Sequence, residues 1–366
     1  MPSPRLALPL LFAAPFLAPA RFAAGNSAPA IGEGGLVPHS DIHLTVAREV
    51  VRISDTRVIV EYDFHNDVAA ELDTELEFPV PDYQNQWDAM DPVLQSFRTL
   101  KVWADGKPVD YQTEARAELN GRDVSKILRD GGIDIASFGH LQIGRDQHNA
   151  VQRIWVADWE RLREKERHHL ESDGLFKGGE GYCVYTVHLR YHWMQRFPAH
   201  ATVHIREEYV PVVGFTEVPA DPGAFKAALT PAAGAGNVWR RSDMGTIRNQ
   251  LGGFCADSRF VQNLLWAQKE FAGTWGQGIV PHWVDFNLTL DVLWHKPIGD
   301  FTLIVDIPQP RNGQQTLVSF CPPGVVDKHD SAHPQLHLTN YTPGTDLHVG
   351  FFNVPMQSQG EPVAAR

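Results

Sequence analysis

The chain has 366 residues, 43% of them hydrophobic and 21% charged, which is ordinary for a folded protein of two domains or of one domain with a large insertion. Its formal net charge of −12 argues against nucleic acid and anionic lipid headgroups as partners, because like charges repel. A chain of this length buries a sufficient core without disulfides to hold the fold together.

The N-terminus has the pattern of a cleaved signal peptide over residues 1–25. Arg5 supplies a positive charge, an uncharged apolar stretch follows, and Ala23-Ala24-Gly25 offers the small residues that a signal peptidase requires. The stretch is too short and too rich in proline for a membrane-spanning helix, and an N-terminal anchor is the alternative. We expect a periplasmic or secreted mature chain from Asn26 without a transmembrane segment. Cleavage removes Arg5, Arg21 and no acidic residue, which changes the formal charge from −12 to −14.

Alternation of apolar and polar residues with a period of two dominates the mature sequence and predicts half-buried antiparallel strands. In the first third, these segments are 42–46, 58–64, 74–78, 100–103 and 109–113. Asp105-Gly106 separates the last two and predicts a hairpin, because both positions of such a turn favour positive φ.

Between residues 119 and 172 the period changes to that of a helix, which predicts a helical insertion that packs against the strands or covers them as a lid. Residues 123–129 fit a short helix, and residues 147–169 fit a longer one. Strands resume over 182–210. A proline- and alanine-rich stretch over 219–235 has the composition of a linker.

In the last third, a helix is predicted over 258–269, with Asp257 as its N-cap. Further alternating strands are predicted at 284–292, 301–305, 336–338 and 347–351. The sequence thus predicts a mostly-β protein with α insertions, built as two antiparallel β-sandwich-like parts. These parts are an N-terminal domain over 26–215, which includes the helical insertion, and a C-terminal domain over 216–355, followed by a disordered tail over 356–366.

Three cysteines occur, Cys183, Cys255 and Cys321, and their spacing fits neither a thioredoxin-type site nor a zinc ribbon. Export to an oxidising compartment permits one disulfide. We predict the pair Cys255–Cys321, because both residues lie at edges of the same strand-rich region. Three small buried thiols are the alternative.

The sharpest cluster of candidate metal ligands lies in the segment 185–210. His188 and His192 lie on the polar face of its first strand, and His204 and Glu208 lie on the polar face of the returning strand. If the two strands pair as a hairpin, His192 is opposite His204 and His188 is opposite Glu208, with Cβ atoms about 4.5–5.5 Å apart. Two imidazoles at that separation suit zinc or copper.

Met194 on the same face would favour cuprous copper, whereas Arg190 and Arg206 would repel a bound cation. The alternative is therefore that this polar face is only the hydrated side of a hairpin. A second, weaker cluster consists of His329, His333 and His337 beside Pro334.

Several short blocks stand out along the mature chain. They are Asn26-Ser27, Gly34-Gly35-Leu36, Val60–Asp67, Phe78-Pro79-Val80-Pro81, Tyr191–Ala199, Tyr209–Gly214, Leu293–Phe301 and Val318–Cys321. Together they resemble an uncharacterised family of bacterial exported proteins, domain-of-unknown-function family 4424, over nearly all of the mature chain. The Phe-Pro-Val-Pro block is also similar to the β-sandwich domain at the start of vault and inter-alpha-trypsin-inhibitor proteins. Neither resemblance brings catalytic residues.

The sequence contains no Gly-x-Ser-x-Gly elbow, no His-Glu-x-x-His and no phosphate-binding loop, which favours a non-catalytic protein over an enzyme. We expect an exported envelope protein that serves as a binding or scaffolding module, with an envelope protein or polymer as its partner. The alternatives are a periplasmic transition-metal-binding protein, with zinc or copper at the histidines, and a hydrolase that acts on envelope polymers.

Overall fold

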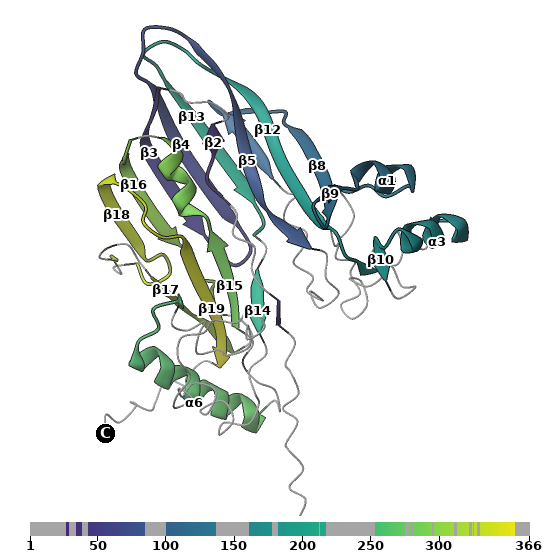
Figure 1. Cartoon of the computed structure of the whole chain (residues 1–366). Helices are drawn as coiled ribbons and strands as arrows, with labels where there is room; N and C mark the ends of the chain where they lie inside the picture. Colours follow the sequence, from purple (N-terminus) through teal and green to yellow (C-terminus); the bar gives the residue numbers. More distant parts are fainter. Residues whose placement is uncertain are drawn as a thin grey trace, which may run out of the picture.

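The computed structural model describes residues 27–28, 34–38, 43–84, 100–136, 161–177, 182–211, 213–216, 253–274, 279, 281–294, 296–310, 313–321, 324, 326–327 and 330–355. The predicted signal peptide and C-terminal tail, together with the predicted linker, lie outside these residues. The described part is mostly β, as predicted, with three large sheets and one two-stranded pair (Figure 1).

The largest sheet, here called the seven-stranded sheet, has the strand order β18-β16-β3-β4-β13-β6-β7. Its strands are β3 (Leu44–Ile53), β4 (Val58–Asn66), β6 (Lys101–Ala104), β7 (Lys107–Pro108), β13 (Thr202–Tyr209), β16 (Ile298–Val305) and β18 (Gln335–Tyr341). The pairing is antiparallel except between β3 and β16, which are parallel. Asp105 and Gly106 have φ of 49° and 75° between β6 and β7, which confirms the predicted turn. The returning strand predicted over 109–113 is wrong, because the strand that pairs with β6 across this turn is Lys107–Pro108.

Two five-stranded sheets complete the β structure. The β12 sheet has the order β2-β5-β12-β8-β9, and the β15 sheet has the order β1-β14-β15-β19-β17. The strands of the β12 sheet are β2 (Val37–Pro38), β5 (Leu72–Gln84), β8 (Gln112–Leu119), β9 (Arg122–Asp123) and β12 (Thr186–Phe197). Those of the β15 sheet are β1 (Ser27–Ala28), β14 (Gly214–Thr216), β15 (Pro281–Phe286), β17 (Gln314–Phe320) and β19 (Leu347–Pro355). The small pair is β10 (Phe176–Lys177) and β11 (Tyr182–Cys183).

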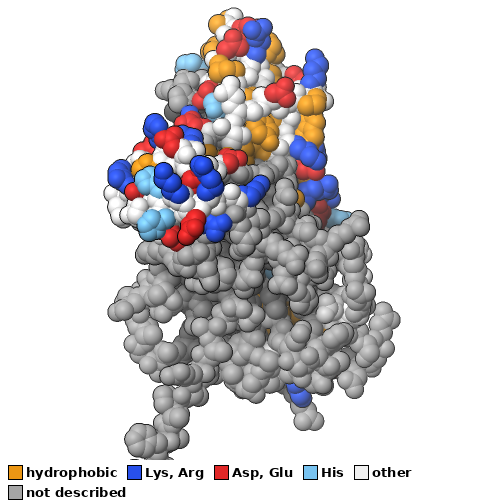
Figure 2. All heavy atoms as spheres, turned by 90° about the vertical axis from the view of Figure 1, so that its right-hand side faces the viewer, with side chains coloured by type: hydrophobic (Ala, Val, Ile, Leu, Met, Phe, Trp, Pro, Cys, Tyr) orange, Lys and Arg blue, Asp and Glu red, His pale blue; other side chains and the backbone are white. Residues whose placement is uncertain are grey.

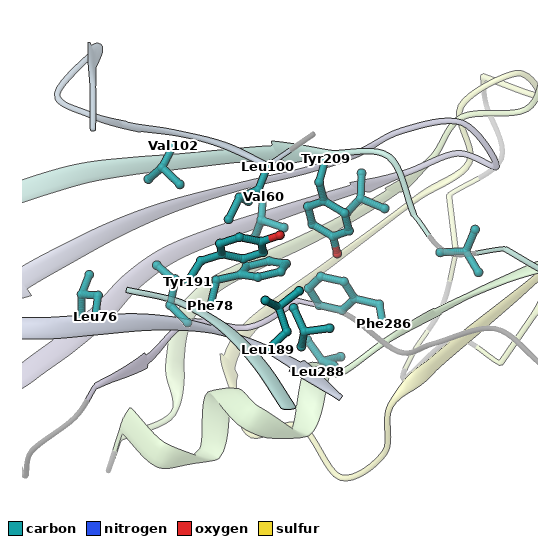
Figure 3. Close-up of a cluster of buried hydrophobic side chains, with 14 of the residues drawn as sticks. Val60, Leu76, Phe78, Leu100, Val102, Leu189, Tyr191, Tyr209, Phe286 and Leu288 are labelled. Atoms are coloured by element: carbon teal, nitrogen blue, oxygen red, sulfur yellow. The ribbon is translucent and has the colours of Figure 1, made fainter. Parts of the chain in front are cut away.

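The seven-stranded sheet and the β12 sheet pack face to face. Aromatic rings bridge them at two levels, because Phe78 of β5 lies 5.2 Å from Tyr209 of β13, and Phe64 of β4 lies 6.0 Å from Phe197 of β12, between ring centroids. Buried side chains of all three large sheets belong to one hydrophobic cluster, part of which is drawn in Figure 3. Alternate residues of β4 and of β12 are buried, as the period-two pattern of the sequence predicts.

The strand predicted over 284–292 is correct only as far as Phe286. Residues Leu288–Trp294 form the 3₁₀-helix η3, where Asp346 accepts hydrogen bonds from the backbone nitrogen and the hydroxyl of Thr289 at 2.9 and 2.7 Å. This helix directs Trp294 into the core, where its indole nitrogen donates to the carbonyl oxygen of Leu36 at 2.9 Å. A buried indole needs such a partner, and a continued strand would not supply it.

Three α-helices of the described part flank the sheets: α1 (Ser125–Asp130), α3 (Glu164–Ser172) and α6 (Ser258–Thr274). Asp257 accepts a hydrogen bond from the backbone nitrogen of Phe260 at 2.7 Å, which confirms the predicted N-cap of α6. The helix predicted over 147–169 is confirmed over 164–169, but it is not continuous through Leu162 and Arg163. Arg163 is extended, with φ −67° and ψ 150°, and α3 starts after it, where the Glu166 side chain accepts a hydrogen bond from the backbone nitrogen of Arg163 at 3.0 Å.

The division of the mature chain at residue 216 stays a prediction. The seven-stranded sheet takes β16 and β18 from beyond this position and its other five strands from before it. The proposed N- and C-terminal domains therefore share a sheet and a hydrophobic cluster. Helix α6 packs on the outer face of the β15 sheet through a separate, smaller cluster that includes Leu264, Trp283 and Phe352.

Candidate functional site

The structure separates the four side chains predicted to form a metal site. Strand β12 pairs with β5 and β8, whereas β13 pairs with β4 and β6 in the facing sheet. The predicted hairpin register, with His192 opposite His204 and His188 opposite Glu208, is therefore wrong. Because the inner faces of the two sheets pack against each other, the outward-facing polar residues of β12 and β13 lie on opposite sides of the sandwich.

The short connection after Phe197 is held in place by Asn66 at the end of β4. The Asn66 side-chain nitrogen donates to the carbonyl oxygens of Ala70, Phe197 and Pro198 at 2.8, 3.0 and 3.1 Å. Its oxygen accepts from the backbone nitrogen of Val68 at 3.0 Å. These contacts fix a chain crossing from one sheet to the other where the sequence suggested a turn within one sheet.

Each predicted ligand has its own partner. His188 Nδ1 lies 2.6 Å from Asp82, His192 Nδ1 lies 3.2 Å from Glu75, and His204 Nδ1 lies 2.8 Å from Asp63, in each case measured to a carboxylate oxygen. Glu208 bonds with Arg206. Within the residues that the structure describes, His, Cys, Asp and Glu form no group of three or more arranged to hold a metal ion.

The second histidine cluster is likewise divided. His333 bonds with Asp330, and His337 with Asp300, both at 2.8 Å, while His329 lies outside the described residues. Each of these pairs is explained as a local surface contact.

Cys255 and Cys321 form a disulfide, the pair expected from the sequence, with Cα atoms 5.0 Å apart. It joins the segment before α6 to the end of β17. Next to it, Ser319 donates to the carbonyl oxygen of Phe254 at 2.8 Å. The disulfide thus attaches α6 to the edge of the β15 sheet and is structural in its position.

The outer side of the β12 sheet carries an array of linked ionisable side chains. We call it the β12 face and define it by Glu71, Asp73, Glu75, Glu77, Asp82, Glu114, Arg116, Glu118, His188, Arg190, His192, Met194 and Arg196. The sequence pattern identified the β12 members of this face. It did not reveal their partners on β5 and β8, although both strands show the same alternation of charged residues.

Arg190 is the centre of the β12 face. Its guanidinium lies 3.7 Å from Glu75 and 3.0 Å from Glu77 on one side, and bonds with Glu114 on the other, with Nε to Oε2 at 2.7 Å. The hydrogen bond from Arg190 lowers the pKa of Glu114. His188 lies between two carboxylates, Asp82 at 2.6 Å and Glu118 at 3.9 Å. The side chains are thereby held in fixed positions across three strands.

The opposite outer face, on the seven-stranded sheet, has a different balance of positive and negative side chains. There an uninterrupted series of contacts alternates three arginines with three carboxylates and ends at a histidine. The series is Arg57, Glu208, Arg206, Glu61, Arg48, Asp63 and His204. Arg206 also lies over the ring of Trp103, at 4.7 Å from its centroid.

The described residues on the side of the molecule that bears α1 and α3 form local ion pairs. In Figure 2, basic, acidic and histidine side chains of the described residues are interleaved there. Local pairs account for several of them, such as Lys126 with Asp130 and Arg163 with Glu166. Pairs of this kind are exposed and contribute little to stability.

One half-buried pair has perturbed protonation. Burial raises the pKa of Asp55, in the turn between β3 and β4, and lowers the pKa of His282 on β15, so both groups are shifted toward their neutral forms. The hydrolase alternative would require a carboxylate with a raised pKa in an acidic cleft. Asp55 instead has a histidine beside it, whose charge opposes its shift.

A family model described as "Domain of unknown function (DUF4424)" matches residues 24–349. The chain belongs to this family. The match includes strands of all three large sheets and confirms the resemblance drawn from the sequence blocks. For this DUF4424 protein, no curated protein gives a sequence match.

Among solved structures, this DUF4424 protein is similar to a protein from Legionella pneumophila subsp. pneumophila str. Philadelphia 1, described as a "putative nutrient binding protein". The two share 13% sequence identity and a TM-score of 0.40, over 89% of this chain and 72% of the other. None of the helices in the described part of the DUF4424 protein has the length and apolar character of a membrane span.

Proposed function

We propose that this DUF4424 protein is an exported, non-catalytic binding or scaffolding module of the bacterial envelope, and that it binds its partner through the β12 face. The observation that carries the proposal is a sheet face whose polar side chains are fixed by cross-strand contacts and yet reach solvent. Asp82 and Glu114 keep 60% and 54% of their side chains exposed, and Met194 is 65% exposed. Fixed, exposed side chains lose little conformational freedom on binding.

Binding is favoured over catalysis by the chemistry of this face. Its defining residues include neither a hydroxyl nor a thiol nucleophile. Three carboxylates, Glu75, Glu77 and Glu114, share the single positive charge of Arg190. The pKa of Glu114 moves down, away from the range in which a carboxyl group acts as an acid near neutral pH. An ordered array of this kind suits recognition, where charge pattern and shape decide specificity.

Export is supported by the charge, length and cleavage-site pattern of residues 1–25. The test is to fractionate the native bacterium and determine the N-terminus of the protein in each fraction. We expect a chain that starts at Asn26 in the periplasm or the medium. A chain that keeps Met1 and remains in the cytoplasm would contradict export.

The binding proposal is tested by placing the photoreactive amino acid p-benzoylphenylalanine at position 194 in the full-length protein, expressed in the native bacterium. The matched control carries it at position 339, where Thr339 is exposed on β18 at the far edge of the seven-stranded sheet. We expect a covalent adduct of defined mass from position 194 and none from position 339. Equal adducts from both positions, or none from position 194, would remove the β12 face as the binding surface.

A further inference from the structure

We infer that the partner of the β12 face is a basic segment of another polypeptide that places an apolar side chain on Met194. This inference rests on the proposed function and names the chemistry of its partner. Three features of the described residues carry it: the charge of the face, the place of Met194 within it, and the contrast with the opposite face.

The β12 face has an excess of negative charge that its own arginines do not remove. Among its defining residues are seven carboxylates and three arginines, which leaves a formal charge of −4 when the histidines are neutral. The excess is concentrated on β5, whose outward positions Asp73, Glu75 and Glu77 follow one another along the strand. A row of carboxylates at strand spacing, about 7 Å apart, matches alternate residues of an extended basic segment.

Met194 gives this charged surface an apolar contact point. It is the exposed large hydrophobic residue of the described part, and it lies opposite Glu75 in the register of β12 and β5. Its strand neighbours on the same face are His192 and Arg196, so charged and polar groups surround it. An apolar residue within a polar rim is the arrangement found where binding energy is concentrated, and methionine adapts its shape to different partners.

In its series of contacts, the opposite outer face lacks the excess of negative charge found on the β12 face. The arginines and carboxylates are equal in number there, so the formal charge of that series is zero with a neutral histidine. Its tryptophan, Trp103, is covered by Arg206. A basic segment is therefore attracted to one side of the sandwich, and the attraction orients the protein on its partner.

The experiment uses the mature chain and a fluorescein-labelled oligolysine peptide with one central leucine, at about 0.15 M salt, with binding followed by fluorescence anisotropy. The comparison probes are the same peptide with serine in place of leucine and its oligoglutamate counterpart. The test variants are Glu75→Gln with Glu77→Gln, and separately Met194→Ala. The control, Glu61→Gln with Asp63→Asn, removes the same charge from the opposite face.

We expect the first double variant to weaken binding about five- to tenfold and Met194→Ala about threefold, with the control within about twofold of the unmodified protein. Replacing leucine by serine in the probe should reproduce the Met194→Ala effect and add nothing to it. Thermal unfolding of each variant establishes that the fold is retained, and Met194→Lys provides a second change at the same exposed position.

Equal weakening by the test and control double variants would show attraction by net charge alone and would overturn the inference, as would equal binding of oligoglutamate. The crosslinking experiment separates the two levels of the proposal. An adduct at position 194 with an acidic protein or a polysaccharide would preserve the binding surface and refute the basic partner. Absence of any adduct there would refute the surface itself.

Discussion

Replacement of Asn66 by alanine tests the account of how the two facing sheets are connected. The side chain is fully buried, and its nitrogen contacts the three carbonyl oxygens of Ala70, Phe197 and Pro198. An amide nitrogen has two hydrogens, so these contacts amount to two donated hydrogen bonds, and the bond accepted from Val68 is a third.

At about 1 kcal/mol for each hydrogen bond, Asn66→Ala should lower the free energy of unfolding by about 3 kcal/mol. The loss of stability is larger if the carbonyl groups that lose their hydrogen-bond donor remain shielded from water. The assay is urea unfolding followed by circular dichroism and tryptophan fluorescence, so that coincidence of the two transitions checks two-state behaviour.

The variant Asn66→Asp separates hydrogen bonding from packing, because it preserves the shape of the side chain. At neutral pH it replaces two donors by a carboxylate that faces carbonyl oxygens, so it should destabilise at least as much as alanine. The stability of this variant, relative to the unmodified protein at the same pH, should recover on acidification, because the carboxyl group gains a proton to donate. A loss below about 1 kcal/mol for Asn66→Ala would refute the proposed role of this residue.

Three further changes have defined outcomes. Gly34 has φ 106°, and Gly34→Ala would place a methyl group against the ring of Phe286, so it should lower the free energy of unfolding in urea by about 2–4 kcal/mol. Cys255→Ser with Cys321→Ser removes a crosslink across 66 positions and should cost about 4 kcal/mol from loop entropy, a loss that reductant should reproduce in the unmodified protein. The hydrogen bond to Asp285 raises the pKa of His348, so its contribution to stability is complete below about pH 6.5 and is lost as the pH rises through the raised value. His348→Gln should therefore destabilise the protein more at acidic than at alkaline pH, by under about 1 kcal/mol for this partly exposed pair, and equal effects at both would contradict the assignment.

The sequence identifies which residues share a face more reliably than it identifies the neighbouring strand. On β12 the alternation assigned His188, His192 and Met194 to the polar side, and the observed burial follows that alternation. Period two carries this information because adjacent side chains of any strand point to opposite sides. It contains no information about the strand that lies alongside.

Because the pattern did not identify the neighbouring strands, the predicted metal ligands were wrongly placed next to one another. The connection from β12 to β13 is short enough for a hairpin, and the contacts that make it cross between sheets come from Phe64 and Asn66, more than a hundred positions earlier in the chain. The carboxylates that accompany Arg190 also come from distant segments, so the β12 face could be assembled only from the structure. The start of helix α6 was predicted correctly, because its N-cap residue, Asp257, directly precedes the helix in the sequence.

The parallel pairing of β3 with β16 affects how the chain reaches its native state. Arg52 and Asp306, which bond across this junction at 2.6 Å, are 254 positions apart. Contacts between residues so far apart in the sequence form late in folding. Until these contacts form, the edge of β3 remains open to other strands. A nascent chain therefore cannot complete its central sheet before nearly all of it has been synthesised. Until then, the partly made polypeptide exposes an unpaired strand edge, which favours aggregation.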